Sequence, residues 1–294
     1  MFVTLRSNQA ALNTQRALEI QTRSLETTMR RLATGLRVER ASDDAAGLSI
    51  VTRMSARIRG FNMAIRNVND GISVVQVADG ALEATTEALQ RMRELAVQAA
   101  NGTVSGTDRA SLSLEKDQLI SEIQRIAAQT TYNHYTLLNG VSNIAYFTTP
   151  GGTPGGSRTS LQMSFQVGAN AGQNVVVEMT LAHVSALGLG NNGSLTSMLT
   201  QGGASTLIGR VDSALESVAS IRANLGAAQN RFEGMLSNLM NVSENTEAAR
   251  SRIRDADVAL EAAHLTRASI LQQAGTAILA QANVQPQMLL KLLS

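Results

Sequence analysis

An unbroken heptad pattern in the second half of the chain constrains the fold more than any other feature. Apolar or small residues recur there at alternating steps of three and four positions: Val211, Ala214, Val218, Ile221, Leu225, Ala228, Phe232, Met235, Leu239, Val242, Thr246 and Ala249. Such spacing is typical of a coiled-coil seam. A helix of roughly 40 residues is about 60 Å long at 1.5 Å per residue. Because it can bury this seam only against other long helices, the sequence predicts a mainly α fold built as a long-helix bundle.

The first half of the chain supplies suitable partner helices. Seven-residue repeats occur there in two runs: Val68, Val75, Leu82, Leu89 and Ala96, and then Leu112, Leu119 and Ile126. Asn101-Gly102 and Gly106 between the runs favour a turn, so the two helices form an αα-hairpin. We expect the later long helix to pack on this hairpin through these residues: Val68, Val75, Leu82, Leu89, Val218, Leu225, Phe232 and Leu239.

The two ends of the chain repeat the pattern with fewer large apolar residues. The positions are Leu18, Leu25, Met29, Leu32 and Leu36 near the start, and Leu271, Ala274, Ile278, Ala282 and Leu289 near the finish. Gln15, Thr22 and Gln285 interrupt these weaker seams.

The middle of the chain has a different composition. Thirteen of the 23 glycines lie between residues 140 and 209, where Arg158 and Glu178 are the only charged residues. Apolar and polar residues alternate over 161–167, and 175–181 is rich in β-branched residues, as in strands. Glycines between these segments favour a turn, so we expect a small antiparallel β-hairpin region in mid-chain.

Composition excludes several classes of protein. The chain has no cysteine, so it has no disulfide scaffold, thiolate zinc site or cysteine nucleophile. Its net charge of +2 demands no polyanionic partner. No apolar run reaches the roughly 18 residues that a membrane span needs, and residues 1–12 lack the apolar stretch of a secretory signal. If the protein leaves the cell, we expect it to use another route.

Two motifs suggest chemistry but lack the context that this chemistry needs. Residues 188–193 match the dinucleotide fingerprint GxGxxG, yet no parallel βαβ unit is predicted around them, and Asp212 opens a heptad helix. A flexible glycine loop is the simpler interpretation. Asp43-Asp44 lies among arginines, which favours a structural ion-pair network or a helix start over a metal site.

The remaining candidates are histidines and arginines. The three histidines, His134, His183 and His264, are scattered and lack a second ligand at metal spacing. The 23 arginines suit phosphate recognition, but they are mostly interleaved with acids and amides, and no aromatic residues lie nearby for base stacking. We therefore expect no catalytic, metal or cofactor site, and neither nucleic acid nor membrane as a partner.

Several segments together carry a family resemblance. They are AALNTQR at 10–16, LATGLR at 32–37, ASDDAAGLSI at 41–50, RNVNDGIS at 66–73, LQRMRELAVQAANGT at 89–103, SRIRDAD at 251–257, ILQQAG at 270–275 and LAQAN at 279–283. Over nearly its whole length the sequence resembles bacterial flagellins.

The resemblance implies a homo-oligomeric filament subunit with a layered domain organisation. Residues 1–42 and 255–294 would pair as a coiled coil that lines a central channel, with assembly contacts at the seam residues of the two ends given above. Residues 43–139 and 210–254 would form a helical shell, and 140–209 a hairpin and loop insertion of that shell.

The resemblance also implies a route and partners. Flagellins leave the cytoplasm unfolded through the flagellar type III export apparatus and function in the extracellular flagellum. The implied partners are an export chaperone, the filament cap, the hook-filament junction proteins and a Toll-like innate receptor of hosts. The positions that match the receptor contacts are Gln90, Arg91, Leu95 and Glu115.

This chain also departs from the family pattern. Only about 70 residues are available where flagellins usually carry a large outer region, and Val258 stands where a Tyr is common. Three other functions remain open at this point. They are a hook-filament junction protein, an arginine-rich coiled-coil nucleic-acid binder, and an enzyme that uses the glycine loop.

Overall fold

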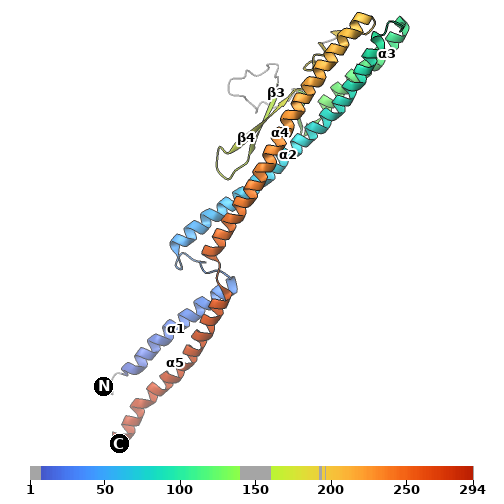
Figure 1. The fold of residues 1–294 in the computed structure, drawn as a ribbon. Helices are drawn as coiled ribbons and strands as arrows, with labels where there is room; N and C mark the ends of the chain where they lie inside the picture. Colours follow the sequence, from blue (N-terminus) through green and yellow to red (C-terminus); the bar gives the residue numbers. More distant parts are fainter. Residues whose placement is uncertain (1–7, 140–159, 192–193, 196, 294) are drawn as a thin grey trace. The chain divides into compact units, whose positions relative to one another are not determined.

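The computed structural model describes residues 8–139, 160–191, 194–195 and 197–293. Most of them are helical, which confirms the predicted mainly α fold (Figure 1). The helices are α1 (Gln9–Thr34), α2 (Ala45–Ala100), α3 (Gly106–Gln129), α4 (Gln201–Arg254) and α5 (Val258–Leu293).

Local sequence signals explain where three of the helices begin or end. The Asn8 side chain accepts a hydrogen bond from the Ala11 amide, and Gly35, which caps the C-terminal end of α1, has a φ of 68° that suits glycine. Ser105 and Asp108 form a capping box at the start of α3. The Asp257 carboxylate accepts hydrogen bonds from the Ala259 and Leu260 amides and so caps α5.

The chain divides into two compact units. The first unit contains Met1–Ile58 and Glu244–Ser294, and the second contains Arg59–Ser243. The division falls inside α2 and α4, whereas the sequence placed the borders near residue 42, between α1 and α2, and residue 254, where α4 ends. Of the predicted insertion at 140–209, residues 140–159 lie outside the described residues, and the described remainder belongs to the second unit.

The first unit is dominated by α1 and α5, which run antiparallel and side by side (Figure 1). Their antiparallel direction is fixed at both ends. Arg31 and Glu261 meet at 3.1 Å, and the Asn8 side chain donates to the Ala282 carbonyl at 2.7 Å.

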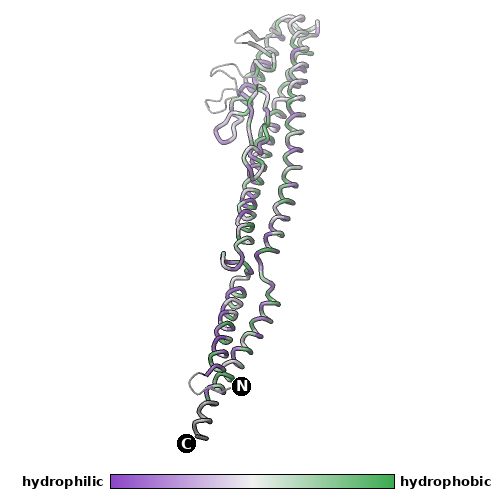
Figure 2. The backbone as a smooth tube through the Cα atoms, turned by 90° about the vertical axis from the view of Figure 1, so that its left-hand side faces the viewer, coloured by the Kyte–Doolittle hydropathy of each residue, from purple (hydrophilic) through white to green (hydrophobic). Residues whose placement is uncertain are grey.

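The second unit has one apolar core, which α2, α3, α4 and the central hairpin share. Hydrophobic and hydrophilic residues alternate closely along these helices (Figure 2), as expected for helices with one buried face. None of the described helices combines the length and the apolar character that a bilayer-spanning segment needs.

The predicted mid-chain hairpin is confirmed. Strands β3 (Ser160–Gln166) and β4 (Asn174–Thr180) pair antiparallel, from Ser160 opposite Thr180 to Gln166 opposite Asn174. Val175, Val177 and Met179 face the core, which gives β4 the alternation of a half-buried strand.

Two very short strand pairs were not predicted. They are β1 (Thr131–Tyr132) with β2 (Tyr135–Thr136), and β5 (Gly190–Asn191) with β6 (Ser194–Leu195). The turn between β1 and β2 places Asn133 and His134 at positive φ, the geometry of a tight hairpin turn. Two-residue strands leave too little alternation in the sequence to be recognised.

Candidate functional site

Small side chains bring the terminal helices α1 and α5 close together. The least exposed positions of α5 are spaced by alternating steps of four and three: Glu261, Leu265, Ala268, Gln272, Gly275, Leu279 and Ala282. Opposite them, Leu18 lies in a space that Gly275 leaves open, since a Cβ at Gly275 would be 3.2 Å from Leu18 Cδ1. The pair is therefore a close-packed antiparallel coiled coil with little apolar area in its seam.

The structure places the predicted residues of the two ends on two different faces. Leu18, Leu25, Leu32 and Leu36 are half-buried. In contrast, Met29, Leu271 and Ile278 are 54%, 49% and 58% exposed, and Ala274 is exposed as well. The Leu289 side chain lies outside the described part of the structure. The intramolecular seam of α5 runs through Gln272, Gly275 and Leu279, one position after the predicted Leu271, Ala274 and Ile278, and it meets the predicted seam at Ala282.

A second apolar face therefore remains open on this helix pair. It includes Leu12 and Ile20 on α1 and Leu260 and Ile270 on α5, all more than half exposed. Since the seam between α1 and α5 is already filled, this face has no partner among the described residues. Large apolar side chains are thus exposed along both helices of the pair.

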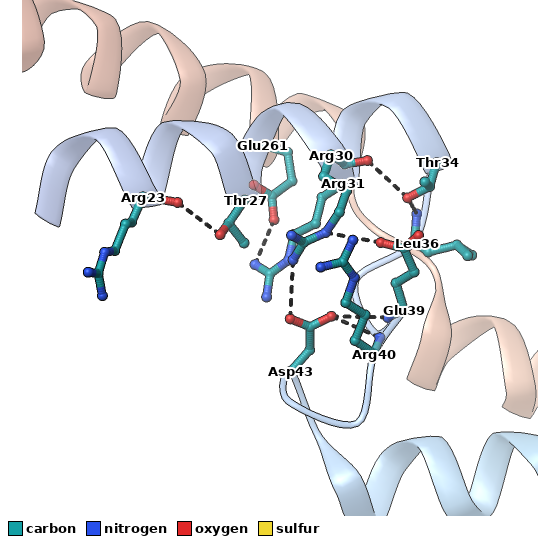
Figure 3. Close-up of polar contacts among 10 residues, drawn as sticks. All are labelled: Arg23, Thr27, Arg30, Arg31, Thr34, Leu36, Glu39, Arg40, Asp43 and Glu261. Atoms are coloured by element: carbon teal, nitrogen blue, oxygen red, sulfur yellow. Dashed lines mark hydrogen bonds and ion pairs between the residues drawn. The ribbon is translucent and has the colours of Figure 1, made fainter. Parts of the chain in front are cut away.

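An ion-pair cluster at the end of α1 holds the segment that follows it (Figure 3). Arg30 contacts Glu39 at 3.0 Å and Asp43 at 3.3 Å, and Arg31 contacts Glu261 of α5. Asp43 also accepts hydrogen bonds from the backbone amides of Arg40 and Glu39. This is the structural ion-pair network that the sequence favoured at Asp43.

These contacts change the acidity of Asp43. The Arg40 amide, then the Glu39 amide and the positive charge of Arg30, lower the pKa of the Asp43 carboxyl below its ordinary value of 3.8, and partial desolvation opposes them. The carboxylate therefore stays ionised wherever the other exposed acids do.

The same junction joins the two ends of the chain through their backbones. Leu36 and Asp255 form an isolated antiparallel bridge, and the amides of Arg37 and Val38 donate to the Arg254 carbonyl. The Ala256 amide donates to the Gly35 carbonyl at 2.9 Å. Segments more than 200 residues apart in the sequence are thus tied together where both terminal helices meet their loops.

In the second unit, the residues predicted for helix packing lie together. All but one are buried members of the shared core, and Leu239 is half-buried against it: Val68, Val75, Leu82, Leu89, Val218, Leu225 and Phe232. The buried face of α4 begins at Ala204, seven residues before the predicted start. Near the C-terminal end of α4, the predicted seam residue Val242 is 39% exposed, and the next residue, Ser243, is buried in its place.

Phe232 is the largest apolar side chain in this core, and glycine makes room for it. A Cβ at Gly71 of α2 would lie 2.9 Å from Cζ of the Phe232 ring. Phe165 of β3 meets Phe232 edge to face, with ring centroids 5.5 Å apart. One side chain of α4 thus contacts both α2 and the hairpin.

The hairpin is held on α2 at two further points. A Cβ at Gly60 would lie 2.8 Å from the Cβ of Ala169 in the hairpin turn. The Asn67 side chain donates to the Gln166 carbonyl at 2.9 Å. The sequence analysis did not predict these contacts. The available signal was a glycine and an asparagine, Gly60 and Asn67, inside a helix, since both allow another segment to approach the helix closely.

The four residues matched to receptor contacts do not share one surface. Gln90, Arg91 and Glu115 are exposed, and Arg91 binds Glu115 at 2.8 Å and Glu94 at 2.9 Å. Hydrogen bonds from both carboxylates, first that of Glu115, raise the pKa of Arg91. Leu95 is 1% exposed, so it supports the bundle core and is no part of the exposed surface.

The other candidate sites gain no support in the described part of the chain. No group of three or more metal-ligating side chains occurs among the described residues. Gly188 has positive φ in a turn, and Gly190 lies in β5, which pairs antiparallel with β6, so the GxGxxG segment has no dinucleotide-binding context. Asn192 and Gly193 of this motif lie outside the described residues.

Comparisons with known proteins identify the same protein family at both ends of the chain and over nearly its whole length. The family model of the bacterial flagellin N-terminal helical region matches residues 5–143, and that of the bacterial flagellin C-terminal helical region matches residues 208–293. A flagellin of Halalkalibacterium halodurans is 41% identical over 286 residues, which are 97% of this chain and 98% of the relative. A flagellin of Bacillus subtilis is 40% identical over 306 residues, with the same coverage.

One solved structure resembles this chain in fold but has little sequence identity to it. A putative flagellar hook-associated protein from Vibrio parahaemolyticus superposes with a TM-score of 0.56 at 13% identity, over 72% of this chain and 100% of its own.

Proposed function

Since the chain belongs to the bacterial flagellin family, we propose that its terminal helix pair is the part through which it polymerises. Family membership makes the chain a structural subunit of the extracellular flagellar filament and not an enzyme. Its homo-oligomeric state follows from the same membership.

One observation carries the proposal. The paired terminal helices leave large apolar side chains exposed, Ile20 and Ile278 among them, although their mutual seam is filled. Burial of such side chains contributes roughly 1.5–3 kcal/mol each. Identical copies joined by heterologous contacts that do not close into a ring form an open helix. Residues 1–42 and 255–294 then form the filament core, and 43–139 with 210–254 the shell that carries the 140–209 insertion.

A substitution on the exposed face of α5 tests this proposal. Ile278→Asp places a charge in the proposed contact, so the variant should fail to elongate filament seeds in electron micrographs. Its helical circular dichroism should remain, because Ile278 is 58% exposed in the single chain. Val176→Asp on the outer face of β4 is a matched control that should elongate normally. Elongation by Ile278→Asp at the rate of the unsubstituted chain would refute the proposal.

Export and assembly partners follow from the same membership. We propose that the chain crosses the cell envelope unfolded through the flagellar type III apparatus, with an export chaperone, and meets the hook-filament junction proteins and the filament cap outside. Cells that lack the export apparatus should retain the chain inside. Its appearance in the medium of such cells would contradict the route.

Recognition by a Toll-like innate receptor is a second proposed property. The exposed ion-pair group of Arg91, Glu94 and Glu115 supports it, because charged side chains joined across two helices form a fixed polar surface. Arg91→Ala should weaken the response of reporter cells to the monomer without loss of helicity. No response to the unsubstituted monomer would refute the proposal.

The other functions raised by the sequence are not favoured. The likeness to a hook-associated protein concerns the fold alone, whereas whole-chain identity is to flagellins. Many arginines are occupied within the chain, such as Arg93 with Asp212 and Arg222 with Asp79, which leaves fewer for phosphate.

A further inference from the structure

A polar groove runs along the α1–α5 pair, and the Arg31–Glu261 ion pair described above is part of its lining. It has a volume of about 560 Å³. The lining residues that matter for its chemistry are Arg23, Ser24, Arg31, Glu261, Arg267 and Leu271.

The groove carries positive charge that the chain does not neutralise. Three arginines stand against one glutamate in its lining. Arg23 is paired with Glu19 at 2.6 Å and Arg31 with Glu261, but the Nε of Arg31 is buried and lacks a hydrogen-bond partner among the described residues. Arg267 is exposed and makes no ion pair or side-chain hydrogen bond with any described residue.

The chemistry of the groove fits a glutamate side chain. A guanidinium group binds a carboxylate through two parallel N–H donors. Leu271, about half exposed beside Arg267, offers an apolar wall for the two methylene groups that precede a glutamate carboxylate. A free inorganic anion would leave this wall unused.

A suitable glutamate lies on the same helix pair. The described parts of α1 and α5 contain three acidic residues, Glu19, Glu26 and Glu261. Two of them are engaged in the ion pairs above, and Glu26 is exposed without an ion pair or hydrogen bond to the described residues. It is therefore the free carboxylate of this pair.

The position of Glu26 prevents it from entering its own groove. Ser24 lines the groove, and two residues along an α-helix correspond to a rotation of about 200°. Glu26 thus lies on the opposite face of α1. Each copy carries the groove on one face and a complementary carboxylate on the other.

We propose that Glu26 of one copy occupies the α1–α5 groove of the next and pairs there with Arg267. The contact joins two different surfaces of the chain, so it can repeat from copy to copy without forming a closed ring. It adds an ion pair between copies to the apolar contacts of the filament core. This inference rests on the proposed function, because polymerisation supplies the neighbouring copy.

Charge reversal in the full-length chain tests the pairing. In the Glu26→Lys variant, a lysine would meet Arg267 of the neighbouring copy, so two positive charges would be in contact. In the Arg267→Glu variant, two glutamates would be in contact. Each variant alone should elongate seeds roughly tenfold more slowly at low ionic strength, where like charges in contact are most unfavourable. An equimolar mixture of the two variants should elongate several-fold faster than either variant alone, at about half the rate of the unsubstituted chain, because each filament end accepts only the complementary half of the subunits.

The controls separate this inference from the proposed function. Arg16→Glu, an equal charge change at an exposed position of α1 outside the groove, should elongate normally. Failure of the unsubstituted chain to elongate would refute polymerisation itself. Normal elongation by Glu26→Lys, or a mixture no faster than its components, would overturn the Glu26–Arg267 contact and leave polymerisation standing.

Discussion

The contact between Gly71 and Phe232 shows how one missing side chain sets the packing of two long helices. The Phe232 ring is fully buried and occupies the space above Gly71. Any side chain at position 71 has to displace this ring, which is also held by Phe165. The relative position of α2 and α4 therefore depends on a glycine inside a helix, where glycine is otherwise unfavourable.

Gly71→Ala should destabilise the chain, by about 1–3 kcal/mol, because the added methyl overpacks the ring. Gly80→Ala on the same helix is the matched control. A Cβ there meets no atom within 4 Å, so the substitution should stabilise α2, by up to about 1 kcal/mol. Urea unfolding of both variants measures the difference. Equal effects of the two substitutions would contradict the account of the Phe232 contact.

Asp43 gives a prediction about acidity. Its pKa is lowered in the folded chain, so its contribution to stability is complete above the unfolded value near 3.8 and is lost as the pH falls through the lower folded value. A carbon NMR titration should find the Asp43 carboxyl below 3.8. Arg30→Gln should move this pKa upward, although the amide hydrogen bonds keep it from returning fully. A midpoint at or above 3.8 in the unsubstituted chain would contradict the contacts of Figure 3.

At the scale of elements, the coiled coil of α1 and α5 depends on small residues in its seam. Gly275→Val adds three carbons where Leu18 Cδ1 is already 3.2 Å from a Cβ position. The helices should move apart, at a cost of about 1–3 kcal/mol, and amides of α1 should exchange with deuterium faster. Ala274→Val, at the neighbouring exposed position, should leave exchange in the monomer unchanged. Unchanged exchange in Gly275→Val would show that the seam lies elsewhere.

Periodicity was sufficient to predict the long helices and most of the core of the second unit. The heptad positions from Val211 to Leu225 and Phe232 are buried, and Ala228, Met235 and Leu239 are half-buried against the same core, because large apolar residues at regular spacing leave one choice of face. The hairpin at 160–180 was predictable for the same reason, from its alternation and its glycines.

The terminal seam was predicted less well, and the reason is physical. On α5 large apolar residues lie on both faces: Leu265 and Leu279 are half-buried in the seam with Gln272 and Gly275, whereas Leu271 and Ile278 are exposed. A pattern of hydrophobicity therefore does not choose between the two faces, and only the close approach of α1 identifies the intramolecular seam. The groove with Arg267 was missed because its residues come from two ends of the chain.

At the scale of the whole molecule, the charges of the terminal segments are also divided between contacts within the chain and proposed contacts between copies. Residues 1–42 carry seven arginines and three glutamates. In the folded chain Arg30 and Arg31 hold the junction, and Arg23 is paired with Glu19. Among the remaining charges, Glu26 is exposed without an ion pair to the described residues, and it is the charge that we propose contacts another copy.

Electron microscopy of seeded polymerisation tests the central claim most directly. The intact chain and a version that lacks residues 1–42 are added to short filament seeds under identical conditions. The account predicts long tubular filaments from the intact chain alone, because the truncated version lacks α1 and with it both the helix pair and Glu26. Filaments grown from the truncated version, or an intact chain that stays monomeric while remaining helical, would contradict it.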